Sequence, residues 1–460
     1  MLKLSLEDTI AAISTPIGEG GIGIVRISGQ DSLKIVKKIF ISKSKRDPLE
    51  FKTFTMHYGK IISSGEIIDE VILTLMRAPK SYTKEDVVEI NCHGGRIALG
   101  RILELVLTNG ARLAEAGEFT RRAFLNGRID LAQAEAVVDI ICAKTDFALK
   151  MSLEQLQGRL SGEIKQMRSQ LLGALSFLEA QIDFPQEDAV LEQKQNIKKN
   201  LFIVLEKLRG MLAGSKSARL YREGLHVVIC GKPNVGKSSL LNAILKKERS
   251  IVTSIAGTTR DTIEEVVNIK GIPVRIVDTA GILKAKDLVS QKAVVRSQQQ
   301  IKLADLVIVL FDGNRKLSKE DLRLMRKLKS RKVIAVINKI DLKQKINKEI
   351  IKNIFPHLVE LAAKKNKNIN LLEEAISNLV HQKTVGTSES VMVSSLRHIN
   401  AIAQAEKLIA EAGNSLDNGL SLEFVAQGIK DALGYLDRIL GKDFPEDLLD
   451  RIFNRFCIGK

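Results

Sequence analysis

Tryptophan is absent from the 460 residues, and aromatic residues make up only 4% of them. Proteins that bind single-stranded nucleic acid by stacking its bases need aromatic platforms, so this composition disfavours that class. Cysteine is also scarce, and its four positions include no Cys-x-x-Cys pair: Cys92, Cys142, Cys230 and Cys457. The sequence therefore predicts neither a structural zinc site nor a disulfide framework.

Long apolar runs are missing too. The longest, near Leu306–Phe311, has the length of a strand and falls far short of the roughly 18 residues of a membrane-spanning helix. Glu7 and Asp8 precede any apolar stretch, a pattern unlike a signal or transit peptide. These features predict a reduced, cytoplasmic protein without membrane association.

Charge is plentiful and unbalanced, with 71 Lys and Arg against 54 Asp and Glu, a formal net charge of +17. A chain this basic is typical of proteins that meet a polyanion, and nucleic acid is the first candidate. The alternative is a lysine-rich surface without a specific partner. A hydrophobic content of 45% is enough for buried cores, and the length suggests about three domains.

Apolar periodicity divides the chain into four stretches. Residues 1–126 combine β-type runs at Thr9–Ser14, Gly23–Ile27, Val71–Met76 and Val87–Asn91 with a helical pattern at Ile97–Leu107, which predicts an α+β domain. Residues 127–223 have apolar spacings of three and four, typical of long helices, with a break at Pro185. Residues 385–460 return to that helical pattern.

Between the helical stretches, residues 224–384 alternate strands and helices. The strand-like runs are His226–Cys230, Val274–Val277, Leu306–Phe311 and Val333–Ile337. This alternation predicts a mostly parallel sheet with helices on both faces. We therefore expect an α/β domain inserted into an all-α domain.

The strongest motif is Gly231-Lys-Pro-Asn-Val-Gly-Lys-Ser238, which follows a strand and precedes a helix as a phosphate-binding P-loop does. Its glycines allow backbone N–H groups to face phosphate oxygens, Lys237 would reach the β- and γ-phosphates, and the Ser238 hydroxyl would bind Mg²⁺. Asp278-Thr-Ala-Gly281 and Asn338-Lys-Ile-Asp341 each end a later strand. Asp341 can accept both guanine N1–H and the 2-amino group, so the predicted nucleotide is GTP.

A predicted switch loop, Thr253–Asp261, lies between the first two motifs, and its Thr259 is the natural second hydroxyl for Mg²⁺. We expect catalysis to involve Lys237, Thr259, Asp278 and Gly281. The full set expected at GTP is Asn234, Val235, Gly236, Lys237, Ser238, Ser239, Thr253, Ser254, Ile255, Ala256, Gly257, Thr258, Thr259, Asp278, Thr279, Ala280, Gly281, Asn338, Lys339, Asp341, Ala362, Ala363 and Lys364.

The P-loop and switch sequences resemble those of potassium-dependent, translation-factor-like GTPases. In that group an asparagine and loop carbonyls hold K⁺ where other GTPases place an arginine. The resemblance assigns K⁺ here to Asn234, Thr253, Ile255 and Thr258. A cation between the phosphates would stabilise charge on the leaving group.

Segments outside this region resemble the bacterial tRNA-modification GTPase family MnmE, also called TrmE. They run from Asp8–Pro16 and Gly20–Gly29 to the C-terminus. The others are Tyr82–Glu89, His93–Gly95, Gly117–Asn126, Asp130–Ala136 and Phe456–Lys460.

The family resemblance implies an N-terminal folate-binding and dimerising domain, a helical domain and an inserted Ras-like GTPase domain. It also implies an FAD-containing partner, MnmG (GidA), in a heterotetramer or larger complex. Together they would modify carbon five of the wobble uridine in certain tRNAs with a tetrahydrofolate derivative. The matching folate contacts are Arg26, Glu89, Arg128 and Lys460. A carboxylate suits the donor edge of a pterin and cations suit a glutamate tail.

The roles of three further parts of the sequence depend on the chemistry of their residues. Cys457 is either an inert terminal cysteine or, as proposed for the family, a participant in the modification. The family's general-base glutamate falls on Ser290, so Asp287 or Gln291 takes its place or turnover is slow. The base-closing segment is Ala362-Ala363-Lys364, which lacks the usual serine hydroxyl but leaves the Ala363 N–H for guanine O6.

Two other functions stay open. One is a ribosome-assembly GTPase that binds rRNA, although such proteins usually add an RNA-binding module or a second GTPase domain. The other is a folate-dependent aminomethyl transferase that merely carries a GTPase domain. Modification that persists in a Lys237→Ala variant would support the latter.

Overall fold

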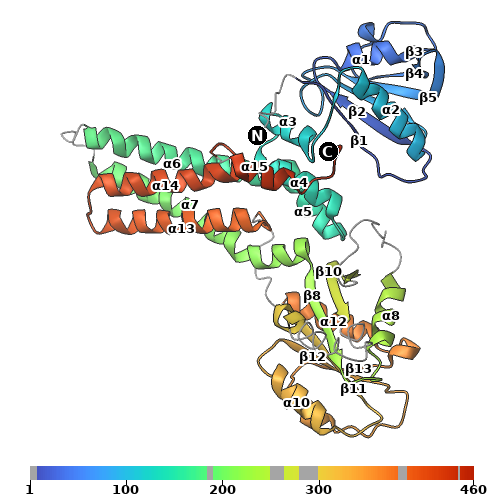
Figure 1. Cartoon of the computed structure of the whole chain (residues 1–460). Helices are drawn as coiled ribbons and strands as arrows, with labels where there is room; N and C mark the ends of the chain where they lie inside the picture. Colours follow the sequence, from blue (N-terminus) through green and yellow to red (C-terminus); the bar gives the residue numbers. More distant parts are fainter. Residues whose placement is uncertain (1–7, 184–189, 249–263, 279–298, 382–390, 444–445) are drawn as a thin grey trace. The chain divides into compact units, whose positions relative to one another are not determined.

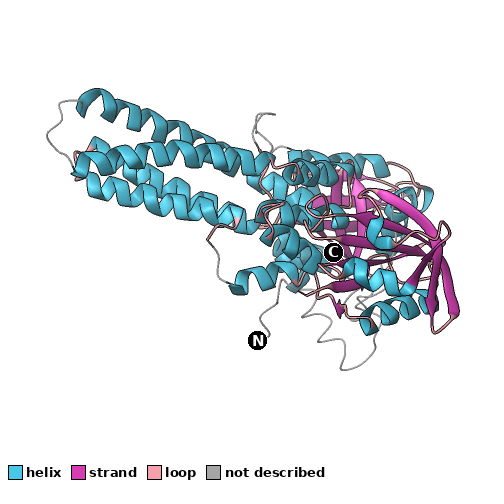
Figure 2. Cartoon of the chain, turned by 90° about the horizontal axis from the view of Figure 1, so that it is seen from above, coloured by secondary structure: helices cyan, strands magenta, loops and turns pink. Residues whose placement is uncertain are grey.

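The computed structural model describes residues 8–183, 190–248, 264–278, 299–381, 391–443 and 446–460. Its described residues form two compact units. The first contains residues 1–138, 155–166 and 436–460, and the second contains residues 139–154 and 167–435. Each has its own sheet, coloured by secondary structure in Figure 2.

The first unit is built on a seven-stranded sheet in the order β3-β4-β5-β6-β2-β1-β7. Strands β4 and β5 form a hairpin, and at the turn between them Ser64 and Gly65 have φ values of 48° and 85°. Two consecutive positive φ angles are the signature of the tight turn that matches strand twist. The strands are β1 (Ile10–Ile13), β2 (Gly23–Ser28), β3 (Phe40–Ser42), β4 (Thr55–Ser63), β5 (Glu66–Met76), β6 (Val87–Cys92) and β7 (Arg112–Leu113).

One face of this sheet is covered by α1 (Ser32–Ile39) and α2 (Arg96–Thr108), whose Val36, Leu99 and Ile102 are buried in its core. On the other face α3 (Glu118–Leu125) buries Phe119 against Ile10. The sequence pattern predicted the α+β class, four of the strands and α2. It missed α1 and α3 because both are only eight residues long, about two turns each.

The helices that follow are α4 (Leu131–Cys142), α5 (Asp146–Leu156), α6 (Arg159–Asp183) and α7 (Val190–Glu223). The C-terminal ones are α13 (Leu396–Asp417), α14 (Leu422–Leu440) and α15 (Glu446–Phe453). In the second unit α7 lies along α13, where Lys198 pairs with Asp417 and Arg209 with Glu406 (Figure 1). The predicted long helices are therefore present, and α7 ends at Glu223.

The second sheet has six strands in the order β13-β12-β11-β8-β10-β9, all parallel except for the antiparallel β9–β10 pair. This confirms the predicted mostly parallel sheet. The strands are β8 (Leu225–Gly231), β9 (Glu264–Ile269), β10 (Ile272–Asp278), β11 (Leu306–Asp312), β12 (Val333–Asn338) and β13 (Leu358–Glu360).

Helices cover both faces of the second sheet, as expected. On one face α8 (Lys237–Glu248) and α12 (Ile369–His381) bury Leu240 and Leu372 against Ile308. On the other, α10 (Lys319–Leu328) and α11 (Lys348–Lys352) bury Met325 and Ile351 against Val309. Because residues alternate across a strand, neighbouring β11 residues serve opposite faces. Loops that follow the parallel strands meet at one edge of the sheet, where the predicted nucleotide motifs lie.

Candidate functional sites

The P-loop lies between β8 and α8 in a conformation that its sequence explains. Gly231 and Gly236 have φ values of 146° and 101°, in a region where side chains are strained. A Cβ on Gly236 would approach Asn338 Nδ2 to 2.2 Å. Asn234 also has a positive φ, of 65°, and its side chain is exposed. The loop therefore turns sharply and leaves the predicted K⁺-binding asparagine open to solvent.

Lys237, the first residue of α8, is only 5% exposed. Its ammonium group donates to the Gly231 carbonyl at 2.9 Å and to the Lys232 carbonyl at 2.8 Å. Ser238 and Ser239 are exposed beside it. The N-terminus of α8 therefore offers a buried ammonium and two accessible hydroxyls at the place where an anion is favoured.

Asn338 connects the P-loop to the base-closing segment. Its side-chain amide donates to the Val235 carbonyl at 2.8 Å, and its Oδ1 accepts the backbone N–H of Ala363 at 3.0 Å. Asn338 is 2% exposed and Ala363 is 3% exposed. The structure thus brings together three residues predicted at the GTP site: Val235, Asn338 and Ala363. It also shows that the Ala363 N–H is already bonded, so contact with guanine O6 requires that bond to be shared or broken.

Lys339 links the P-loop to the end of β11. Its ammonium donates to the Asn234 carbonyl at 2.8 Å and to Asp312 Oδ2 at 2.6 Å. The sequence analysis missed Asp312, although a carboxylate at the end of a parallel strand was a usable signal. Asp341 pairs with Lys365 at 3.6 Å.

Several predicted residues lie outside the described part of the chain or at its limit. Asp278 ends β10 with its backbone in register with Ile229, and its side chain is among those not described. Outside the described residues are the general-base candidates Asp287, Ser290 and Gln291 and the predicted GTP-site residues Thr253, Ser254, Ile255, Ala256, Gly257, Thr258, Thr259, Thr279, Ala280 and Gly281.

A second cluster forms in the first unit, where the C-terminal tail meets the sheet. Arg26 on β2 pairs with Glu89 on β6, with both Nε and Nη2 at 2.8 Å from Oε1. Its Nη1 donates to the Gly459 carbonyl at 3.1 Å. Gly459 has a φ of 95°, and a Cβ there would lie 2.4 Å from the Ile13 carbonyl oxygen. Three of the four predicted folate-contact segments therefore adjoin one another.

The fourth, Arg128, lies over the ring of Tyr82 at 4.7 Å from its centroid. Tyr82 shares a hydrogen bond of 2.9 Å with the Thr120 hydroxyl. Burial raises the Tyr82 pKa, against the lowering effect of that bond and of the nearby Arg128 and Arg26 charges. Tyr82 is thus close to both arginines, and the sequence analysis did not assign it to the site.

Lys460 and Cys457 complete the tail. Burial and the Arg26 charge lower the pKa of Lys460, while Glu89 and Cys457 act in the opposite direction. Residues 457–460 are held by a bridge between Ala116 and Ile458 and by the Ser14 hydroxyl, which donates to Gly459 at 3.0 Å. The thiol of Cys457 is free and its residue is exposed. Lysine, arginines and glutamate thus share one small polar region.

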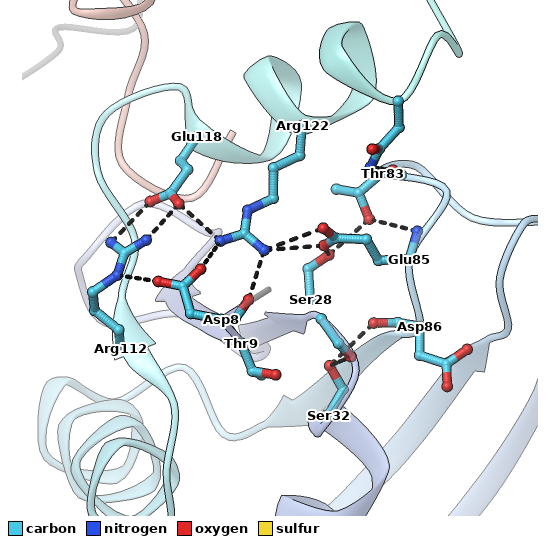
Figure 3. A network of polar contacts seen from close by, with 12 residues as sticks. Asp8, Thr9, Ser28, Ser32, Thr83, Glu85, Asp86, Arg112, Glu118 and Arg122 are labelled. Carbon is cyan, nitrogen blue, oxygen red and sulfur yellow. Dashed lines mark hydrogen bonds and ion pairs between the residues drawn. The ribbon is translucent and has the colours of Figure 1, made fainter. Parts of the chain in front are cut away.

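A buried arginine of the first unit, Arg122, holds several carboxylates together in one network (Figure 3). Arg122 on α3 is 2% exposed, and its guanidinium donates to the Asp8 carboxylate and to Glu118 and Glu85 at 3.0 and 3.2 Å. Arg112 bonds the same Glu118 at 2.7 Å. The same helix also carries Phe119, whose ring centroid lies 5.6 Å from the Arg26 guanidinium. Its Thr120 and Arg122 contact Tyr82 and Glu85 of one loop. Sequence reasoning missed Arg122 because two of its three carboxylate partners, Asp8 and Glu85, are distant in the chain.

Among the described residues, no group of three or more His, Cys, Asp or Glu side chains has the arrangement of a metal site. None of the described helices has both the length and the apolarity needed to cross a membrane.

These observations define a class: a P-loop nucleotide-binding fold with guanine-type base loops, joined to a second folded unit with its own polar site. Comparisons with known proteins identify the family to which the chain belongs. Residues 9–128 match a family model described as "GTP-binding protein TrmE N-terminus", and residues 131–457 match one described as "MnmE helical domain".

Similar curated proteins match along their whole length. The chain is 46% identical over 457 residues to "tRNA modification GTPase MnmE" of Clostridioides difficile (strain 630), covering 99% of this chain and 100% of that one. It is 45% identical over 460 residues to the protein so named from Desulforamulus reducens, with the same coverage. The chain belongs to the MnmE family of tRNA modification GTPases.

Among solved structures, the chain resembles Aquifex aeolicus Era bound to GDP·AlF4⁻, with 30% identity and a TM-score of 0.27. That match covers 40% of this chain and 65% of the Era chain.

Proposed function

We propose that this chain is a GTP hydrolase that acts, with an FAD-containing partner, in modifying carbon five of the wobble uridine of certain tRNAs. The supporting observation is the junction at Asn338, which joins the P-loop to the base-closing loop. Full-length relatives bear the name tRNA modification GTPase. We assign residues 1–126 to folate binding and dimerisation, 127–223 and 385–460 to the helical domain, and 224–384 to GTP.

The proposed reaction is hydrolysis of GTP, in which a phosphate bond of GTP is cleaved and Mg²⁺ would neutralise charge on the phosphates. Lys237 would exchange its two carbonyl partners for phosphate oxygens. The exposed Ser238 hydroxyl suits Mg²⁺, with Thr259 as the second hydroxyl. The exposed Asn234 suits K⁺, with Thr253, Ile255 and Thr258 as the other ligands we propose.

For the one-carbon donor, we assign Arg26, Glu89, Arg128 and Lys460 to a tetrahydrofolate derivative. Arg26 holds Oε1 of Glu89, while Oε2 accepts no hydrogen bond from a described residue, and a carboxylate oxygen can accept from a pterin. Arg128 is exposed and stacked, so its donors can meet a glutamate tail. Lys460 adds a further cation beside them. The donor set therefore fits an anion with a hydrogen-bonding ring.

We propose that the chain forms a homodimer through its N-terminal domain. We also propose that it binds an MnmG-type FAD protein, in a heterotetramer or larger complex, and tRNA. We expect the chain in the cytoplasm. Nucleoside mass spectrometry of tRNA from a deletion strain tests the function. Loss of the modified wobble uridine is expected. Unchanged wobble uridine together with accumulated ribosomal subunits would instead favour the ribosome-assembly function.

Potassium dependence has a direct test in steady-state GTP hydrolysis by the purified chain in KCl and in equal NaCl. Stimulation by KCl is expected if Asn234 holds K⁺, and it would show that another group covers the role of the absent glutamate at position 290. Equal rates in the two salts would contradict the potassium site. Bound GTP without turnover in either salt would point to the loss of that glutamate.

Participation of Cys457 in the modification is tested by Cys457→Ser. The variant should hydrolyse GTP normally but form no modified uridine. Cys142→Ser, which changes another exposed cysteine, is the matched control and should behave as the wild type. Normal product from Cys457→Ser would remove this cysteine from the reaction.

A further inference from the structure

The segment from Arg315 to Lys332 contains an extreme concentration of positive charge. It has nine cations and two acids, a net charge of +7, against +17 for the whole chain. All nine cations are exposed: Arg315, Lys316, Lys319, Arg323, Arg326, Lys327, Lys329, Arg331 and Lys332. Four of them lie within α10, and we call these four the α10 cationic surface: Lys319, Arg323, Arg326 and Lys327. A charge concentration of this kind needs a physical reason beyond solubility.

The fold of α10 sets this surface apart from the core. Met325 and Leu328 face inward, at 0% and 2% exposure, and pack with residues of β11 and β12. Lys319, Arg323, Arg326 and Lys327 recur at helical spacings of four, seven and eight from Lys319, so they lie together on the outer side. The helix is about 15 Å long. It therefore presents a rigid row of cations rather than a mobile tail.

Both acids of the segment are engaged elsewhere. Asp321 is buried and forms a capping box with Ser318, accepting the Ser318 N–H at 2.8 Å. Glu320 pairs with Lys232 of the P-loop at 3.1 Å. The side chains of Lys319, Arg323, Arg326 and Lys327 have no ion pair with any described carboxylate. Four neighbouring cations thus remain available to an external anion.

We propose that the α10 cationic surface is a docking site for the phosphate backbone of the tRNA, an inference that rests on the proposed function. Double-helical nucleic acid has about one charge per 1.7 Å of axis, at least as dense as this surface. Contacts to phosphate fix the position of an RNA without reading its sequence. The surface would therefore hold tRNA without selecting among tRNAs.

The composition of the surface argues for RNA over an anionic membrane. Helices that bind in a membrane interface expose an apolar face next to their cations. The apolar side of α10 is instead buried in the core, and no large hydrophobic residue between 315 and 332 is exposed. A partner that offers only regularly spaced charge fits this helix better than one that requires apolar insertion.

The test measures binding of an unmodified tRNA transcript to the full chain by fluorescence anisotropy over a series of KCl concentrations. The α10 variant replaces four cations by glutamine: Lys319→Gln, Arg323→Gln, Arg326→Gln and Lys327→Gln. The control removes the same charge from other helices and one connecting turn, where the lysines and the arginine are also exposed: Lys407→Gln, Lys430→Gln, Lys442→Gln and Arg451→Gln. GTP binding by both variants checks that they are folded.

The α10 variant should bind tRNA at least about tenfold more weakly. The slope of log K against log salt should fall by about 3, because each of the four phosphate contacts contributes roughly 0.7–0.9. The control should stay near the wild type. Equal losses in both variants, or no loss in either, would overturn the proposal. If the α10 variant lost binding to phosphatidylglycerol vesicles but still bound tRNA as the wild type does, the proposal would also be overturned. Wild-type protein that binds no tRNA at low salt would contradict the proposed function itself.

Discussion

The two candidate sites differ in how they are assembled. The nucleotide edge uses short contiguous motifs, in which Lys237 bonds carbonyls five and six residues away and Asn338 bridges two loops. The tail site instead joins Arg26, Glu89 and Gly459, which are up to 433 residues apart. The first depends on loop conformation and the second on the packing of a whole unit. Mutations should therefore affect activity at the first and stability at the second.

The largest effect is expected from Arg122→Leu. Three carboxylates would lose a buried partner, which typically costs about 3–5 kcal/mol. Urea unfolding of the full chain, followed by a probe in the first unit, measures it. Arg121→Leu is the matched control on the same helix, because Arg121 pairs with the half-exposed Asp450 and such pairs are worth at most about 1 kcal/mol. Similar losses in both variants would contradict a special role for Arg122.

At the nucleotide edge, Lys237→Ala should lower GTP turnover by about 10²–10³-fold while leaving the unfolding free energy of the first unit unchanged. The reason is that a positioned donor to charge developing on the phosphates is removed. Steady-state phosphate release measures this. Lys343→Ala, at an exposed position, is the control. Turnover within a few-fold of the wild type would show that the ammonium does not act on the phosphates.

Gly459→Ala should affect the tail site by an intermediate amount. The positive φ and the close Ile13 carbonyl make the alanine strained, at a cost of about 1–3 kcal/mol that displacing the tail would relieve. Calorimetry with 5-formyltetrahydrofolate should show weaker binding, and GTP turnover should stay normal. Gly413→Ala, where a Cβ has open space, is the control. Unchanged folate affinity would separate the tail from the ligand.

The smallest effect concerns pH. Burial raises the pKa of Asp8, but hydrogen bonds and charges from Arg112 and Arg122 outweigh it, so the pKa lies below its ordinary value. A lowered pKa stabilises the fold above the unfolded-state value near 3.9, and that stability is lost as pH falls through the folded value. Unfolding of the first unit should therefore ease below about pH 4, less so in Asp8→Asn. Identical pH profiles would contradict the network.

The sequence allowed a prediction of the nucleotide edge because motif spacing and strand ends determine it, and the prediction for GTP itself stays untested. Residues such as Lys237, Asn338 and Lys339 follow strands whose apolar runs are easily recognised. Asp312 was missed because no motif includes it. In the first unit, Arg26 and Glu89 came from family resemblance alone. Tyr82, Arg122 and the Gly459 carbonyl became visible only when β2, β6, α3 and the tail were brought together by packing.

If both sites serve one reaction, as we propose, each should be needed when the chain complements a deletion strain. Lys237→Ala disables the nucleotide edge, and Glu89→Gln weakens the tail site. Nucleoside mass spectrometry of tRNA should find the modified wobble uridine restored by the wild-type chain and absent, or strongly reduced, with either variant. Normal modification with Lys237→Ala would contradict the account and indicate a transferase that merely carries a GTPase domain.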